Sequence, residues 1–238
     1  MRRSDINAII RQSDEFIRSF GFLLPPFAYW RPKEMQARLS EIEGIVSGRL
    51  GWDITDYGGG DFDKLGLFLF TVRNGDTADL ARGCGMLYAE KIMISRRDQI
   101  SPMHRHVIKA EDIINRGGGT LALELFASDP DGNIDQEAEV LVATDGIWRR
   151  LPAGGTLLLQ PGESVTLRPG MWHAFWAEGK DTLIGEVSTV NDDLTDNIFR
   201  DPVSRFSTIE EDEEPLHLLV SDYPAWLENA SGRAVAGS

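Results

Sequence analysis

From residue 52 onward the chain alternates between short β-forming segments and clusters of turn-forming residues. The segments lie at residues 67–72, 88–95, 120–127, 139–144, 156–159, 164–167, 173–177 and 182–190. Gly, Pro, Asp and Asn separate them. A succession of many short strands is typical of a β-sandwich or β-barrel. The sequence therefore predicts a mainly β domain.

The first fifty residues have a different, helical pattern. Ser4 or Asp5 is placed to cap a helix whose apolar residues recur at roughly every 3.6 positions, and Gly21 is a plausible end for it. A second helix is predicted at 32–45, with Met35, Leu39 and Ile42 on its apolar face. We therefore expect a helical extension packed on the β domain.

These patterns suggest a division of the chain into three parts. Residues 1–50 form the helical extension, 51–224 form the barrel, and 225–238 read as a frayed tail. Residues 216–220 could add an edge strand to the barrel. A chain of 238 residues is long enough for one well-buried domain with extensions of this kind.

Three of the four histidines belong to one pattern with a glutamate. His104 and His106 are separated by one residue, so on a strand both imidazoles point to the same side. Glu111 follows shortly after, and His173 comes after a Pro-Gly turn. Such a mixed nitrogen and oxygen set suits a divalent transition metal and leaves coordination positions for water or substrate.

Glu111 has the opposite strand parity to the two nearby histidines, so strict alternation would aim it away from them. The residues between His106 and Glu111 must therefore hold a bulge or a turn. Lys109 shares the parity of Glu111 and would face the same cavity. Residues 115–119 contain three glycines, and we expect a tight reversal there before a strand that begins at Thr120.

Composition and charge limit the classes of molecule that this chain is expected to bind. The formal net charge of −14 and the absence of a Lys/Arg-rich run argue against nucleic acid. The single cysteine, Cys84, has no internal partner for a disulfide. No stretch approaches the ~18 apolar residues of a membrane-spanning helix. These features favour a cytoplasmic protein that acts on a small molecule.

The histidine pattern resembles the cupin family, whose fold is a jelly-roll-like double-stranded β-helix. Its first motif is a glycine, five residues, His-x-His, three or four residues, Glu, six residues and a glycine. This spacing is met by His104, His106, Glu111 and Gly118. Asp98 replaces the leading glycine. The second motif is met by Gly162, Gly170 and His173, with Arg168 at the proline position and Ala177 at the final Asn.

More of the chain is similar to the D-lyxose isomerase family of cupin sugar isomerases. The similar stretches are residues 24–30, 51–56, 88–92, 102–106, 109–119 and 185–197, and the resemblance reaches about residue 223. The block from Lys109 to Gly119 and the Val-Asn-Asp-Asp block at 190–193 are its most specific parts. The resemblance implies a manganese-dependent aldose–ketose isomerase, with cobalt or another divalent ion possible, acting on D-lyxose and D-mannose.

Aldose–ketose interconversion through an enediol needs an acid/base group near C1 and C2 and a Lewis acid on their oxygens. His104, His106, Glu111 and His173 would hold the metal. Lys109 and Glu186 are the candidate catalytic residues, with roles that the sequence does not order. Glu186 is expected in apolar surroundings that favour proton transfer. The alternative interpretation of Lys109 is an ordinary lysine whose ammonium group lies in solvent.

Three further residues are candidate substrate-binding groups: Lys91, Glu211 and Asp192. Lys91 lies on the segment 88–95 and is equally suited to a salt bridge. Glu211 belongs to the acidic run 210–214, which is most simply a solvated face. His217, the fourth histidine, is interpreted as an ordinary structural residue.

Two other functions fit a cupin barrel, which by itself does not determine activity. A cupin dioxygenase would use a similar ligand set with iron, and a non-catalytic cupin would only bind a sugar. The polar candidates Lys109, Glu186 and Lys91 favour a polyhydroxylated substrate, and no DNA-binding segment accompanies the barrel. The aromatic residues at 27–30 and the apolar helices lead us to expect a homodimer.

Overall fold

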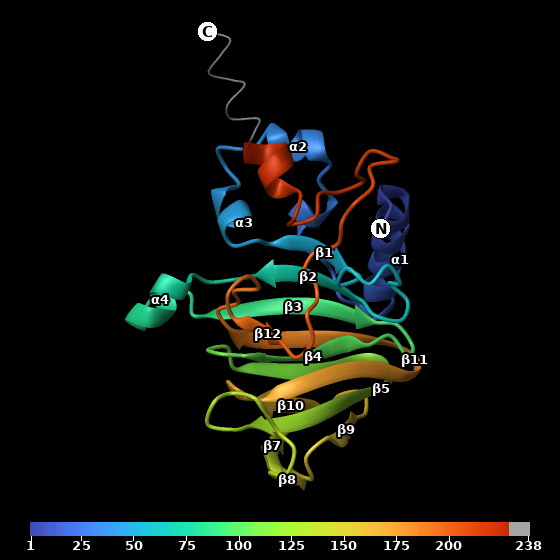
Figure 1. The fold of residues 1–238 in the computed structure, drawn as a ribbon. Coiled ribbons are helices and arrows are strands. Elements are labelled where there is room, and N and C mark those ends of the chain that lie inside the picture. Colours follow the sequence, from blue (N-terminus) through green and yellow to red (C-terminus); the bar gives the residue numbers. More distant parts are fainter. Residues whose placement is uncertain (229–238) are drawn as a thin grey trace.

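The computed structural model describes residues 1–228, whose arrangement is shown in Figure 1. Its helical segments are α1 (Arg3–Ser19), η1 (Pro26–Tyr29), α2 (Pro32–Gln36), α3 (Glu43–Ser47), α4 (Thr77–Arg82) and η2 (Pro224–Glu228). Its strands are β1 (Gly51–Thr55), β2 (Leu67–Arg73), β3 (Tyr88–Ser95), β4 (Ser101–His106), β5 (Glu111–Ser128), β6 (Ile134–Asp135), β7 (Val140–Thr144), β8 (Ile147–Leu151), β9 (Gly155–Leu159), β10 (Ser164–Leu167), β11 (Trp172–Thr189) and β12 (Asn197–Phe199).

Two long strands, β5 and β11, fold the antiparallel sheet into two layers. The first half of β5 pairs with the second half of β11, and the second half of β5 pairs with the first half of β11. In one layer β3 and β10 extend this pair, and in the other β4 and β9 extend it. The mainly β, jelly-roll-like barrel predicted from the sequence is confirmed.

Apolar side chains fill the barrel and also cover one outer face of it. On β2, Leu67 and Leu69 belong to the barrel interior, while Phe68 and Phe70 pack on the other side against α1. Helix α1 contributes the buried residues Ile6, Ile9, Ile10 and Ile17. Because both faces of β2 are buried, the N-terminal helix completes the hydrophobic core of this layer (Figure 1).

The N-terminal helices differ in part from the sequence prediction. Helix α1 runs from Arg3 to Ser19, and Gly21 follows it with a φ of 74°, as a helix-ending glycine should. The single helix predicted at 32–45 is wrong, because the chain forms the two short helices α2 and α3 with turns between them. Such short helices are marginal alone. The packing of Met35 and Ile42 against the C-terminal segment decides their shape.

The tight reversal predicted at residues 115–119 is also wrong, since β5 continues through this segment without a turn. Gly117 and Gly118 take φ values of 145° and 105°. A Cβ atom on Gly118 would lie 2.1 Å from the carbonyl oxygen of Asp181, and one on Gly119 would lie 2.3 Å from that of Lys180. The glycines therefore allow a bend and a close approach to β11, where the pairing register shifts.

The C-terminal segment packs back onto the N-terminal helices. The edge strand predicted at 216–220 is wrong, because this stretch makes only an isolated bridge between Leu219 and Trp52. Helix η2 occupies the start of the predicted tail, and Leu227 is buried against Met35 and Ile42. Residues 229–238 of that tail lie outside the described part. No helix within residues 1–228 is both long and apolar enough to span a membrane.

Candidate active site

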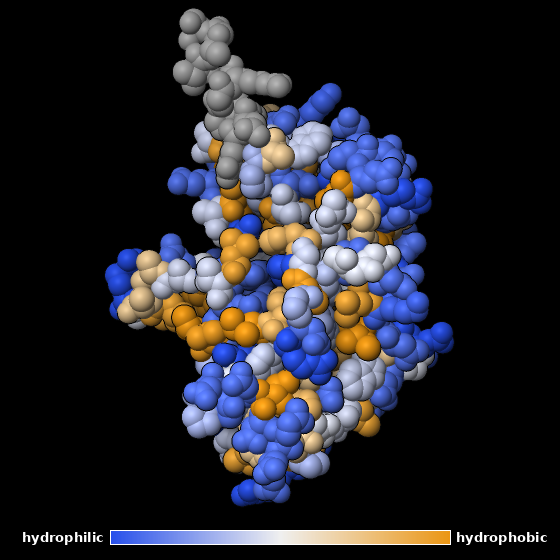
Figure 2. All heavy atoms as spheres, viewed as in Figure 1, coloured by the Kyte–Doolittle hydropathy of each residue, from blue (hydrophilic) through white to orange (hydrophobic). Residues whose placement is uncertain are grey.

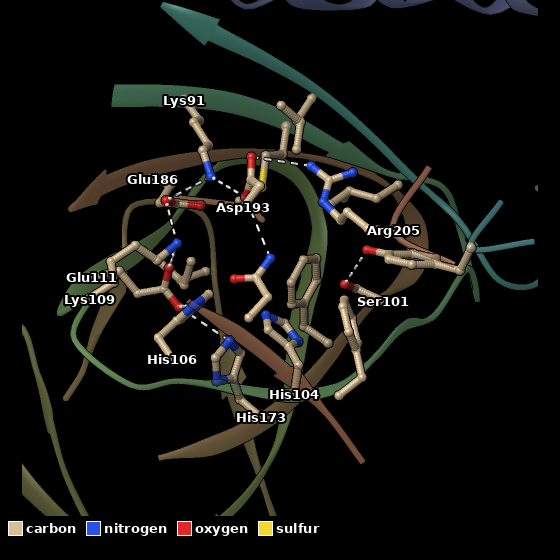
Figure 3. Close-up of a pocket in the computed structure, with 18 residues that line it drawn as sticks. Lys91, Ser101, His104, His106, Lys109, Glu111, His173, Glu186, Asp193 and Arg205 are labelled. Atoms are coloured by element: carbon tan, nitrogen blue, oxygen red, sulfur yellow. Dashed lines mark hydrogen bonds and ion pairs between the residues drawn. The ribbon is translucent and has the colours of Figure 1, made fainter. Parts of the chain in front are cut away.

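The three histidines of the predicted metal-binding pattern, His104, His106 and His173, lie close together inside the barrel. His104 and His106 lie on β4, and β11 pairs with β4 so that His173 stands opposite His104. Their candidate ligand nitrogens all lie within 4.8 Å of one another. Figure 3 shows the three imidazoles converging at the lower end of the cavity. Strand pairing therefore joins two motifs that are almost seventy residues apart.

Glu111 joins this cluster because the chain leaves regular strand geometry after His106. Strand β4 ends at His106 and β5 begins at Glu111, so residues 107–110 form the irregular connection that the parity argument requires. Glu111 Oε1 lies 3.4 Å from His106 Nε2 and 3.2 Å from His173 Nε2. The structure thus brings together all four residues that the sequence proposes as metal ligands.

Hydrogen bonds to backbone carbonyls fix the orientation of two imidazoles. His104 Nδ1 lies 2.8 Å from the carbonyl oxygen of Pro102, and His173 Nδ1 lies 3.1 Å from that of Met171. A carbonyl oxygen only accepts, so each Nδ1 carries the proton and donates it. Each Nε2 is then left with a free lone pair, which is the arrangement found in metal-binding histidines.

The polar atoms of this cluster fit a divalent cation. Glu111 Oε1 is buried and makes no hydrogen bond, although it faces two imidazole nitrogens. Burial, with His173 and His106 nearby, holds the pKa of His104 well below its ordinary value. Burial and the Lys109 ammonium also lower the pKa of His106. Neutral imidazoles around a carboxylate form the donor set that a first-row transition metal takes.

A row of alternating charges continues from the histidine cluster across the cavity (Figure 3). Lys109 Nζ lies 2.7 Å from Glu111 Oε2 and 2.9 Å from Glu186 Oε1. Lys91 Nζ lies 3.4 Å from the same oxygen of Glu186. All four side chains are at least nine-tenths buried. The apolar surroundings expected for Glu186 are therefore wrong, because two ammonium groups flank its carboxylate.

These contacts fix the protonation of two members of the row. Burial alone would lower the pKa of Lys109, but the carboxylates of Glu111 and Glu186 outweigh it and raise the pKa above its ordinary value. Burial alone would raise the pKa of Glu111, but Lys109 and His106 bring it well below its ordinary value. Lys109 is thus an ammonium and Glu111 a carboxylate near neutral pH.

The structure adds Asn191, Asp193 and Arg205 to the site, and the sequence analysis missed all three. Asn191 Oδ1 accepts hydrogen bonds from Lys91 at 2.6 Å and Lys109 at 3.4 Å. Asp193 lies 3.5 Å from Lys91 and 3.3 Å from Arg205, which also binds Asp53 at 2.7 Å. Burial opposes ionisation of Asp193, yet Lys91 and Arg205 hold its pKa well below the usual value. The Val-Asn-Asp-Asp block carried the signal for two of them.

Two predicted substrate-binding residues are not brought to the cavity. Asp192, the neighbour of Asp193, turns outward and accepts hydrogen bonds from Leu194 and Thr195. Glu211 is half-exposed and pairs with the buried Arg3 at 2.6 Å. Neither is among the residues that line the cavity. The loop conformation, which a sequence pattern does not specify, selects Asp193 over Asp192.

The remaining walls of the cavity are aromatic and apolar. The lining residues include Tyr57, Leu69, Met93, Phe175 and Phe199. Burial raises the pKa of Tyr57 to about 12, and its hydroxyl lies 3.3 Å from Ser101 Oγ. His217 lies elsewhere, stacked on Trp52 with its Nδ1 bonded to the carbonyl of Trp30, as its structural interpretation predicted.

The fold and this site together define a cupin-type barrel with a histidine–glutamate cluster that could hold a metal ion, beside buried lysines and carboxylates. A family model described as D-lyxose isomerase matches residues 1–223. The chain belongs to the D-lyxose isomerase family. It is 46% identical over 226 residues to a D-lyxose/D-mannose isomerase of Serratia proteamaculans, covering 94% of this chain and 98% of the relative.

A second relative supports this assignment, and solved structures of other proteins share the fold. A D-lyxose/D-mannose isomerase of Escherichia coli O157:H7 is 43% identical over 228 residues, covering 94% of this chain and 98% of the relative. The fold is similar to that of Cellulomonas parahominis L-ribose isomerase, with a TM-score of 0.57 at 15% identity, covering 88% of this chain and 98% of that one. Geodermatophilus obscurus L-ribose isomerase gives 0.53 at 17% identity, with the same coverage.

Proposed function

We propose that the protein is a metal-dependent aldose–ketose isomerase that interconverts D-lyxose with D-xylulose and D-mannose with D-fructose. The single observation that carries this proposal is the position of Glu186. Its carboxylate lies between two ammonium groups, within 3.4 Å of each, and one of these, Lys109, also contacts Glu111 of the histidine cluster. Family membership supplies the sugars, since the two relatives are D-lyxose/D-mannose isomerases.

His104, His106, Glu111 and His173 would hold the metal, and the nitrogen and oxygen donors suit manganese, with cobalt as an alternative. A bound divalent ion supplies Lewis acidity, which lowers the pKa of the C–H bond beside a carbonyl. The imidazoles of His104 and His106, whose pKa values burial lowers, and the carboxylate of Glu111 provide ligands that need no deprotonation near neutral pH.

The side chains of the cavity can divide the proton transfers between them. Lys109 stays an ammonium because Glu111 and Glu186 raise its pKa, so it is suited to donate a hydrogen bond and unsuited to act as a base. We therefore assign the base to Glu186, which takes the proton from C2 of the aldose and returns it to C1 of the ketose. Lys109 stabilises the negative charge of the enediolate while a hydroxyl proton moves from O2 to O1.

Lys91, Asp193 and Arg205 form the far wall of the cavity and are proposed to bind sugar hydroxyls. Arg205 Nη1 is buried without a hydrogen-bond partner although Arg205 lines the cavity. A polyhydroxylated substrate supplies acceptors for such a donor. Lys91 also forms ion pairs with Glu186 and Asp193, so it serves the salt-bridge role and the substrate-facing role together.

The test is an assay of aldoses and ketoses with protein stripped by a chelator and then given one divalent metal at a time. We expect D-xylulose from D-lyxose, and D-fructose from D-mannose, only after metal is restored. A parallel measurement of oxygen uptake with iron would detect a dioxygenase instead. Ketose formation that persists unchanged in the fully stripped protein would contradict the metal requirement. A cytoplasmic location and a homodimeric assembly stay predictions.

A further inference from the structure

The buried carboxylate of Asp196, which is not one of the proposed reacting groups, is hydrogen-bonded to the backbone of the loop that carries Lys109. Asp196 Oδ1 accepts hydrogen bonds from the backbone N–H groups of Val107 at 2.9 Å and Ile108 at 2.7 Å, and Oδ2 accepts one from Lys109 at 2.9 Å. Only 6% of Asp196 is exposed. Three consecutive N–H groups thus form an anion-binding nest for a single carboxylate.

This nest replaces the strand pairing that the loop lacks. Residues 107–110 lie between β4 and β5, and the N–H groups of Val107, Ile108 and Lys109 make no strand pairing, whereas that of Ala110 donates to Thr189 Oγ1 on β11. Val107 and Ile108 expose 50% and 65% of their surface, whereas Lys109 exposes 3%. The loop therefore turns one lysine into the cavity while its neighbours face solvent, and Asp196 is what holds its backbone in that form.

Asp196 is itself held on both sides. Its N–H donates to the carbonyl oxygen of Asp192 at 3.1 Å, and β12 begins at the next residue, where Asn197 pairs with His106. The same loop supplies Asn191, whose Oδ1 accepts hydrogen bonds from Lys91 and Lys109, and Asp193, which lines the cavity. One side chain thus ties together the two loops that carry the polar groups around both lysines.

We propose that Asp196 is a positioning residue: its carboxylate holds the 107–109 backbone so that the Lys109 ammonium stays between Glu111 and Glu186. The role in catalysis rests on the proposed function, in which Lys109 stabilises the enediolate. The geometric part stands without it, because the nest and the burial of Lys109 are properties of the protein alone. Asp196 touches no reacting atom and acts only through Lys109.

Two substitutions of Asp196 remove its hydrogen bonds to the loop to different extents. Asp196→Ala removes both carboxylate oxygens and the three hydrogen bonds that they accept, leaving Val107 N–H only the backbone carbonyl oxygen of residue 196, at 3.3 Å. Asp196→Asn keeps one oxygen, which serves the N–H groups of Val107 and Ile108 but leaves that of Lys109 facing an amide NH₂ group. The matched control is Asp129→Ala, because Asp129 Oδ1 also accepts from two backbone N–H groups, those of Asp131 and Asn133, in an exposed turn away from the cavity.

The first readout uses protein without substrate. We expect amide hydrogen exchange at residues 107–109 to accelerate in Asp196→Ala, and Lys109 to react faster with an amine-selective reagent, as seen by peptide mass spectrometry. Exchange in the rest of β4 and β5 should be unchanged. Asp129→Ala should alter neither signal. Unchanged protection of residues 107–109 in Asp196→Ala would overturn the proposal.

The second readout is kinetic, on protein whose metal content has been verified. We expect kcat to fall about 10²-fold in Asp196→Ala with little change in KM, because misplacing a catalytic group by about 1 Å has this scale of effect. Asp196→Asn should fall between this variant and the wild type. A kcat equal to wild type, with only a lower Tm, would show a merely structural role. A wild type inactive on every aldose refutes the proposed function, and the exchange and labelling data still decide the positioning.

Discussion

At the residue scale, the site consists of buried charged side chains that lie in close ion pairs with one another. Glu186 is 4% exposed, and within residues 1–228 its ionic neighbours are Lys91 and Lys109. A carboxylate held in this way cannot turn to solvent, and its two partners set its orientation. The spacing of His104, His106, Glu111 and His173 made the metal cluster predictable, since strand parity and the barrel pairing follow from it. The Val-Asn-Asp-Asp block pointed to the loop of Asp193, but neither the choice of Asp193 over Asp192 nor the part of Arg205 was predictable, because the loop conformation aims these side chains.

Replacing Glu186 by Gln tests the assignment of the base. The amide keeps the size of the side chain and an oxygen for Lys109, but it cannot take a proton. We expect kcat to fall about 10²-fold or more while metal content stays the same. Steady-state kinetics and elemental analysis of the same preparation measure both. A Gln variant with near-normal kcat would leave Glu186 as a hydrogen-bonding residue only.

Replacing His106 by Ala tests the metal site. The substitution removes one of three clustered imidazoles, so the variant should lose both the divalent metal and the activity. Wild type is expected to hold one ion per chain by elemental analysis. His217→Ala is the control, since His217 packs on Trp52 outside the cavity and its loss should leave the metal in place. Stoichiometric metal in a His104/His106 double alanine variant would move the site elsewhere.

At the element scale, the strands β5 and β11 carry most of the architecture. Each β-forming run predicted from the sequence corresponds to a strand or part of one, but the prediction missed β1, β8 and β12, divided β11 in two and began β5 too late. Glycine runs allow either a turn or a bent strand, and the choice depends on contacts with a partner some sixty residues away. Helix and tail boundaries failed for a similar reason, because the contacts of Met35, Ile42 and Leu227 with one another decide them. We still propose residues 1–50 as an extension of the barrel 51–224.

Gly118→Ala tests whether the glycines serve the close approach of β5 to β11. The new Cβ would lie 2.1 Å from the carbonyl oxygen of Asp181, at a φ of 105°. We expect a loss of stability of about 2 kcal/mol or more in urea unfolding, from crowding and backbone strain. Gly44→Ala is the control, because nothing lies within 4 Å of its Cβ position and it sits in helix α3. Equal stabilities for the two variants would contradict this account.

The link between α1 and the C-terminal segment is open to a similar test. Arg3 is fully buried and pairs with Asp222 at 2.8 Å, a residue that is 7% exposed. Arg3→Met would leave Asp222 buried without its partner, and we expect a loss of about 3 kcal/mol in unfolding free energy with kcat unchanged. Arg2→Met, at the exposed pair with Asp5, should have a much smaller effect. A comparable effect of both changes would show that burial of the pair is unimportant.

At the scale of the whole molecule, the aromatic stretch 27–30 gives no reason to expect a dimer. Ala28 is buried, and Phe27, Tyr29 and Trp30 pack within the chain. The exposed apolar side chains lie elsewhere, with Ile108 at 65% and Leu194 at 61% on the two loops that Asp196 joins. On the face of the molecule that Figure 2 shows, apolar surface lies near the centre and beside the projecting α4.

These exposed groups keep the homodimer as a prediction, because a second copy would cover them. Light scattering at micromolar concentration should give a particle of about twice the 26.5 kDa of one chain. A particle of one chain mass at that concentration would contradict it.

The most direct test of the central claim is the reaction of D-lyxose in deuterated water with the manganese-loaded protein, followed by mass spectrometry of the sugar product. Transfer by Glu186 passes the proton through a side chain that exchanges with solvent, at least in part. The account therefore predicts a ketose that carries solvent deuterium at C1. Absence of any ketose would contradict the isomerase assignment, and a ketose that retains all of the substrate hydrogen over many turnovers would contradict the proton-transfer mechanism.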